Sequence, residues 1–180
     1  EDAYLHDPLR PLPAAQEGEC EFNGDFSAVQ TRKDMAVYTS APLTRDTEVT
    51  GNIRVRLYAV IDGADGDFWC RLTDVDERGA AHKLVNGMVR ARYRNGLTRE
   101  ELIEPGKPYA YDIDLGNTSN LFRAGHRIRL DIAGSCFPTG DINLSTADRA
   151  GDGSDPRKAV HHILHDGDHP SRLILPVVAR

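Results

Sequence analysis

The sequence predicts an all-β protein built as an antiparallel β-sandwich of two sheets. Short segments in which apolar and polar residues alternate recur along the chain, and turns rich in Gly, Asp and Pro separate them. The clearest alternation spans residues 127–133, where Ile128, Leu130 and Ile132 alternate with charged residues. Only residues 98–103 suggest a helix. A length of 180 residues suits one such domain.

The N-terminal part, residues 1–28, is expected to be an extended linker segment. It carries proline at Pro8, Pro11 and Pro13 and lacks apolar periodicity, which favours a chain that runs over a surface without forming a helix. The alternative is a terminal segment without a fixed conformation. The sandwich domain itself is expected over residues 29–180.

Strands are predicted from alternation or apolar runs along this domain, at residues 35–40, 53–61, 68–72, 83–91, 109–115, 127–133, 159–164 and 172–178. Gly87 indicates a bulge or bend in its strand. Thr98 and Glu101 suit a capping box that begins a turn of helix over residues 98–103. The last segment is apolar on both faces, as in a strand buried on both sides. Residues 134–157 lack periodicity and predict a functional or mobile loop.

Charge and cysteine content exclude several classes of protein. With 22 basic and 28 acidic residues interspersed, the net charge of −6 argues against a nucleic-acid partner. No apolar run approaches a membrane span, so we expect no membrane partner. Cys20, Cys70 and Cys136 are odd in number and scattered, which predicts neither a disulfide framework nor a Cys-x-x-Cys metal site. This pattern leaves the compartment open, with a preference for the cytoplasm, and the absence of an initial Met favours a fragment.

No catalytic residue is predicted in the chain. None of the seven serines lies in the Gly-x-Ser-x-Gly elbow that an α/β-hydrolase nucleophile needs. Gly134-Ser135-Cys136 comes closest, but Pro138 opposes a helix after it. A concealed Ser-His-Asp triad on another scaffold is the open alternative, because a triad is defined by geometry.

Three groups of residues could bind metal, although we predict no metal and no cofactor. One is a run of imidazoles and carboxylates that fits a polar turn before the last strand, with a zinc or nickel site as the rival interpretation. The other two are acidic runs that lack the spacing of a calcium loop and fit solvated turns. The imidazole run comprises His161, His162, His165, Asp166, Asp168 and His169, and the acidic runs are Asp62, Asp65 and Asp67, and Asp148, Asp152 and Asp155.

Trp69 is placed on the outer face of its strand, because Phe68, Cys70 and Leu72 define the buried face. On that face an indole could stack on a sugar ring, pack against another protein surface, or lie beneath a loop of its own domain.

Several segments, in the same order, resemble the C-terminal β domain of the X-Pro dipeptidyl peptidase, cocaine esterase and α-amino-acid ester hydrolase family. They are residues 49–51, 67–75, 87–94, 118–138 and 169–177, of which 118–138 contains Leu-Phe-Arg-Ala-Gly-His-Arg-Ile-Arg-Leu and Ser-Cys-Phe-Pro. Residues 4–8 and 11–13 resemble the family's link between its hydrolase and β domains. The resemblance implies a jelly roll of the galactose-binding-like type. After Pro138 the family's Arg-Asn-rich loop is replaced by Thr-Gly-Asp-Ile-Asn-Leu.

The resemblance implies a non-catalytic C-terminal domain of a serine hydrolase, either an X-Pro dipeptidyl peptidase or an acyl ester hydrolase. Its partner would be an N-terminal α/β-hydrolase catalytic domain of the same polypeptide, whose cleft this domain would wall. The alternative is a free-standing carbohydrate-binding module, which Trp69 and residues 134–157 suggest. A domain that drives oligomerisation is a third hypothesis.

Overall fold

The computed structural model describes residues 2–14, 24–149, 152–153 and 155–179. Two short 3-10 helices, η1 (Val29–Thr31) and η2 (Ala91–Tyr93), accompany the strands. The strands are β1 (Asp2–His6), β2 (Met35–Thr39), β3 (Thr47–Ile61), β4 (Asp67–Val75), β5 (Ala81–Arg90), β6 (Tyr109–Phe122), β7 (Arg127–Ala133), β8 (Ala159–Leu164) and β9 (Arg172–Ile174). None of the helices described is long and apolar enough to cross a membrane.

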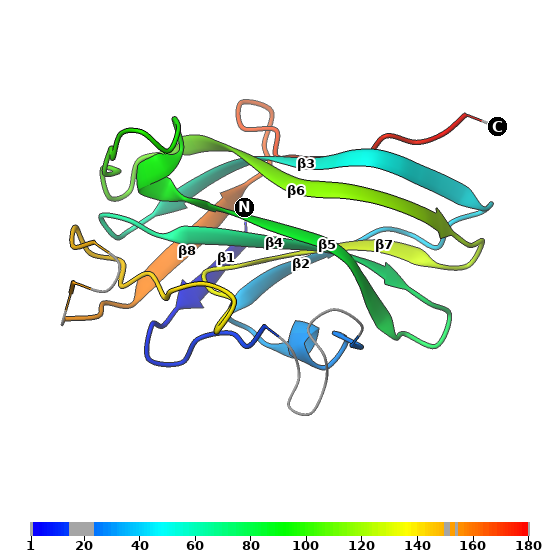
Figure 1. Cartoon of the computed structure of the whole chain (residues 1–180), viewed down its shortest axis with the longest axis horizontal. Coiled ribbons are helices and arrows are strands. Elements are labelled where there is room, and N and C mark those ends of the chain that lie inside the picture. Colours follow the sequence, from blue (N-terminus) through cyan, green and yellow to red (C-terminus); the bar gives the residue numbers. More distant parts are fainter. Residues whose placement is uncertain (1, 15–23, 150–151, 154, 180) are drawn as a thin grey trace.

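The strands form two antiparallel sheets that pack face to face, as Figure 1 shows. One sheet has the order β1-β8-β3-β6, with β9 also paired to β3, and the other has the order β2-β7-β4-β5. The all-β prediction and the antiparallel sandwich are therefore confirmed.

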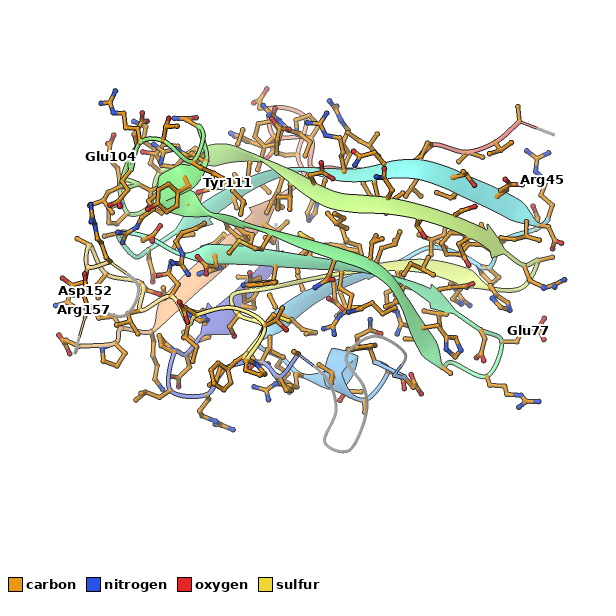
Figure 2. The ribbon with its side chains drawn as sticks, in the orientation of Figure 1. Arg45, Glu77, Glu104, Tyr111, Asp152 and Arg157 are labelled. Carbon is orange, nitrogen blue, oxygen red and sulfur yellow. The ribbon has the colours of Figure 1, made fainter. Side chains whose placement is uncertain are left out.

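The core lies between the sheets and is filled by the alternate residues that the sequence placed there. Val55, Leu57, Ala59 and Ile61 of β3 are at most 2% exposed. Phe68, Cys70 and Leu72 face them from β4, and Tyr111 and Ile113 come from β6. Figure 2 labels Tyr111, whose ring lies 4.8 Å from that of Phe68. Cys70 is thus a core residue as predicted, while Cys20 lies outside the described residues.

The start of the chain is a strand of the sandwich, where we expected a linker over its surface. β1 pairs with β8, and Tyr4 and His6 are each 3% exposed. Only Tyr4 and His6 of β1 enter the core, and two inward side chains followed by a proline-rich stretch form a pattern too short to recognise.

Two further local predictions differ from the structure for identifiable reasons. Gly87 pairs regularly with Cys70, and the irregularity of β4 and β5 falls instead between Leu72 and Thr73. A Cβ at Gly87 would lie 2.1 Å from the carbonyl oxygen of Asp114 in β6, so this glycine allows the two sheets to approach closely.

Residues 98–103 form no helical turn. The backbone N–H of Glu101 donates to the carbonyl of Arg92 at 2.8 Å, and the guanidinium of Arg94 donates to the carbonyl of Glu101. These bonds tie the segment to the end of η2, and Ile103 within it is 4% exposed.

The last apolar segment is only partly a strand, and it is not buried on both sides as predicted. β9 has three residues, and Ile174, Val177 and Val178 are 43%, 57% and 39% exposed. Apolar side chains therefore remain on the surface at this edge of the sandwich.

Candidate functional site

A buried network of charges lies where β4 begins and β5 ends. Asp67 accepts two hydrogen bonds from Arg90, from Nε and Nη2, both at 2.8 Å. Asp65 accepts from Nε of Arg92 at 2.7 Å. The side-chain amide of Asn143 donates to both carboxylates, at 2.9 Å to Asp65 and 2.8 Å to Asp67. Asp65, Asp67, Arg92 and Asn143 are at most 4% exposed.

The strand register produces this network. Asp67 and Arg90 are direct cross-strand partners, and Asp65 and Arg92 lie two residues beyond them. Burial raises the pKa of the Asp67 carboxyl, while the Arg90 and Asn143 hydrogen bonds oppose that rise. Our interpretation of Asp65 and Asp67 as a solvated turn is therefore wrong. An Asp-x-Asp at the start of one strand and an Arg-x-Arg at the end of the next is the pattern that signals this pairing.

The network holds residues 134–149 of the predicted loop against the sandwich. Nη2 of Arg92 donates to the carbonyls of Thr146, at 3.2 Å, and Asp148, at 2.6 Å. The Asn143 side chain also accepts from the backbone N–H of Ser145 at 2.8 Å. The middle of this loop is therefore fixed by buried polar groups.

A second anchor joins this loop to the N-terminal segment. The backbone N–H of Leu12 donates to Oγ of Ser135 at 2.9 Å, and the N–H of Phe137 donates to the carbonyl of Leu12 at 2.9 Å. His6 donates from Nε2 to the carbonyl of Asn143 at 2.9 Å. Ser135, the serine closest to an elbow in sequence, is 5% exposed and binds backbone in this way. The absence of catalytic residues from the chain stays a prediction.

The histidine run divides into a core residue and a surface turn. His161 is fully buried in β8, where the hydroxyl of Tyr4 lies 3.1 Å from its Nδ1 and the Phe68 ring packs against it. Burial holds the pKa of His161 well below its usual value, so the ring is neutral. Outside β8, His165 pairs with Asp2 at 3.1 Å and His169 with Asp166 at 3.1 Å. The strand-then-turn interpretation is confirmed.

Among the side chains that the structure describes, no three His, Cys, Asp or Glu residues are arranged to hold a metal ion. Asp148, Asp152 and Asp155 are exposed, as expected of a solvated turn. Asp152 lies with Arg157 at one end of the sandwich in Figure 2. Asp62 accepts the backbone N–H of Val160 at 2.7 Å. The prediction that the chain binds no metal or cofactor remains a prediction.

Trp69 lies on the outer face of its sheet, opposite Met88 of β5, and is partly covered. A Cβ at Gly140 would lie 2.4 Å from Cζ2 of the indole, so the backbone of the loop packs against the ring. The indole also lines a groove of about 370 Å³ with Met88, Tyr93 and Leu97. Because Met88 is 36% and Leu97 is 86% exposed, the groove presents apolar surface to the outside.

The rest of this outer face carries a second buried ion pair. Nε of Arg71 lies 3.2 Å from Asp131, which also accepts from Gln30 at 2.8 Å. The Arg71 guanidinium stacks on the ring of Phe26 at 4.1 Å. Phe26 and Gln30 therefore cover the outer face beside Trp69.

Comparison with known proteins decides the family. Residues 1–174 match the family described as the X-Pro dipeptidyl-peptidase C-terminal non-catalytic domain. The chain belongs to this family. The match spans nearly the whole chain and confirms the resemblance noted in the sequence.

Individual relatives of this X-Pro dipeptidyl-peptidase C-terminal domain are larger proteins. A cocaine esterase from Rhodococcus sp. (strain MB1 Bresler) is 36% identical over 191 aligned residues, which cover 99% of this chain and 32% of the esterase. An aminopeptidase from a marine sediment archaeon, Thaumarchaeota archaeon, superposes with a TM-score of 0.94 at 25% identity, over 99% of this chain and 33% of that one. An α-amino acid ester hydrolase superposes with a TM-score of 0.92 at 25% identity, and the superposition covers 98% of this chain and 32% of the hydrolase. The chain thus spans about a third of each.

Proposed function

We propose that this domain is the C-terminal part of a serine hydrolase whose catalytic Ser, His and Asp lie in an N-terminal α/β-hydrolase domain of the same polypeptide. The whole enzyme would cleave an ester or an X-Pro peptide bond by attack of the serine, with the histidine as base and the aspartate as its orienter. The family match over residues 1–174 is the observation that carries this proposal.

The role of the domain is to pack on the catalytic domain and to wall its cleft, which excludes water and restricts substrate size. The anchored loop of residues 134–157 supports this role, because a wall must hold its shape. The apolar groove beside Trp69 supports it as well, since exposed Met88 and Leu97 suit a protein contact. Within the sandwich we propose the jelly-roll topology of galactose-binding-like domains.

The carbohydrate-binding hypothesis gains no support from Trp69. The backbone at Gly140 packs against this ring and so covers part of the surface on which a sugar would stack.

The proposal is tested by comparing the isolated 180-residue chain with the full protein. Both are assayed with a nitrophenyl ester and with an X-Pro nitroanilide, and circular dichroism checks that the isolated domain is folded. We expect turnover by the full protein only, and loss of that turnover when the serine of an upstream Gly-x-Ser-x-Gly is changed to Ala. Activity of the isolated domain that Ser135→Ala abolishes would refute the proposal.

Physical association is tested separately by light scattering of the isolated domain with its catalytic domain. A one-to-one complex is expected. Self-association of the isolated domain without such a complex would favour the oligomerisation hypothesis.

A further inference from the structure

A cleft opens between the two sheets along one edge of the sandwich. It has a volume of about 590 Å³. Its walls are aliphatic side chains from both sheets, among them Val55, Leu57, Leu130, Ile132, Leu173 and Leu175. Asp2, Tyr38 and His165 lie at its polar rim. An apolar cleft of this size between two sheets is a place where further chain or ligand can be buried.

The edge of the sheet beside the cleft is only partly covered by a neighbouring strand. β8 and β9 both pair with β3 along the same side, β8 with Tyr58–Ile61 and β9 with Arg54–Arg56. β1 covers the outer edge of β8 and begins at Asp2, opposite Ile163. In the part of the chain that the structure describes, no strand covers the outer edge of β9. An uncovered apolar edge is a surface on which another strand can pair.

The direction of β1 is such that polypeptide continuing it upstream would run along the outer edge of β9. β8 and β9 are both antiparallel to β3, and β1 is antiparallel to β8, so a straight continuation of β1 would be antiparallel to β9. Asp2 pairs with Ile163 of β8, and Ile163 pairs with Ala59 of β3, so Asp2 and Ala59 lie at the same position along the sheet. Since β9 is level with Arg54–Arg56, the positions three to five residues before Asp2 (59 − 56 = 3 and 59 − 54 = 5) would lie beside it.

The first residues of β1 are held at the mouth of the cleft. The hydroxyl of Tyr38 donates to the Asp2 carboxylate at 3.0 Å, and Nε2 of His165 lies 3.1 Å from the same oxygen. Tyr38 belongs to one sheet, and Asp2 belongs to the other. This polar clamp joins the two sheets where the preceding polypeptide would enter.

We infer that the cleft receives the polypeptide upstream of residue 1 in the full protein, as an extended segment that places apolar side chains between the sheets. The inference rests on the proposed function, in which a catalytic domain precedes this one. The relatives are about three times as long as the aligned region, and the family is a C-terminal domain. In the proposed full protein such a segment is therefore covalently joined to the start of this domain. Its tethering gives it a high local concentration at the cleft.

Hydrogen exchange of the backbone amides tests the inference with three proteins. They are the 180-residue chain, the same chain extended by its native upstream polypeptide without the catalytic domain, and the full protein. We expect the amides of Leu173 and Leu175 to exchange about tenfold more slowly, or slower still, in the extended chain than in the short one. The full protein should add little further protection at these two amides.

Two variants of the extended chain sharpen the test. Leu173→Asp, which puts a charge into the cleft, should return exchange at Leu175 to the rate of the short chain. Leu97→Asp is the matched control, because Leu97 is 86% exposed beside Trp69 and should leave the protection unchanged. The comparison of the three unaltered proteins stands even if Leu173→Asp fails to fold.

Other occupants give different results, each of which overturns the inference. Protection that appears only with the catalytic domain means that the body of that domain covers the cleft. Protection of the short chain that disappears on dilution means a second copy, and a small apolar molecule bound to the full protein in native mass spectrometry means a ligand. Unchanged exchange in an active hydrolase refutes the docking alone, whereas a full protein without hydrolase activity refutes the proposed function.

Discussion

Asn143→Asp is expected to release the loop of residues 134–157 while leaving the sandwich folded. The substitution keeps the size of the side chain and replaces its NH₂ donor with an oxygen. The two hydrogen bonds to Asp65 and Asp67 are lost, and a third carboxylate joins two that are 1% and 0% exposed. Arg90 and Arg92 already bind those carboxylates, which leaves no matching cation for the new charge within this network.

The size of the effect follows from these contacts. A hydrogen bond to a charged group contributes about 1.5–3 kcal/mol, so the loss of two corresponds to roughly 3–6 kcal/mol at pH 7. Repulsion between the carboxylates adds to this cost and raises the pKa of the new group. The destabilisation should therefore shrink as the pH falls and the new carboxyl takes up a proton.

Urea unfolding at pH 7 and pH 5 measures the stability, and hydrogen exchange at Ser145 and Arg157 reports on the loop. Asn117→Asp is the matched control, because Asn117 is exposed on β6 and should change stability by no more than about 0.5 kcal/mol. If Asn143→Asp costs as little as this control, the network does not hold the loop and our reasoning is wrong.

Two further predictions concern the core. Gly87→Ala should destabilise the domain by about 3 kcal/mol or more in urea unfolding, because the new Cβ would meet backbone of β6 that must shift; a cost below about 1 kcal/mol would contradict the close approach of the sheets. Because burial depresses the pKa of His161, this histidine takes up a proton below about pH 6.5 only in the unfolded state. The free energy of unfolding therefore falls as the pH falls below that value, by up to about 1.4 kcal/mol per pH unit. His161→Gln should remove this part of the slope between pH 7 and 5, and equal slopes in the two proteins would show that His161 is not its source.

The sequence predicts the sandwich well because its strands carry a strong period-2 signal. In β3 and β7 the alternation extends over many residues, and a slip of one position would expose every core side chain, so face and register follow from the pattern. β1 was missed because its signal consists of Tyr4 and His6 alone, directly before a proline-rich stretch. The identity of its partner, β8, depends on a contact across more than 150 residues, which local periodicity does not carry.

The candidate site was harder to predict than the fold because its residues look like surface residues. Asp65, Asp67, Arg90 and Arg92 have the composition of solvated turns, and only the pairing of β4 with β5 brings opposite charges together and allows them to be buried. Asn143 adds a donor from a loop that has no periodicity. Burial of this network is thus a property of the tertiary structure.

The chemistry of the network also fits the role that we propose for the loop. A buried ion pair is seldom more stabilising than well-packed apolar residues of the same volume, so stability alone gives little reason for placing five polar side chains here. Apolar side chains can slide past one another without losing their contacts. The two hydrogen bonds from Arg90 to Asp67, and the two from the side-chain amide of Asn143, instead fix the relative orientation of the groups that they join. Arg92 passes that orientation to the loop through the carbonyls of Thr146 and Asp148. A loop that is to wall another domain's cleft needs a defined position, and directional hydrogen bonds provide it.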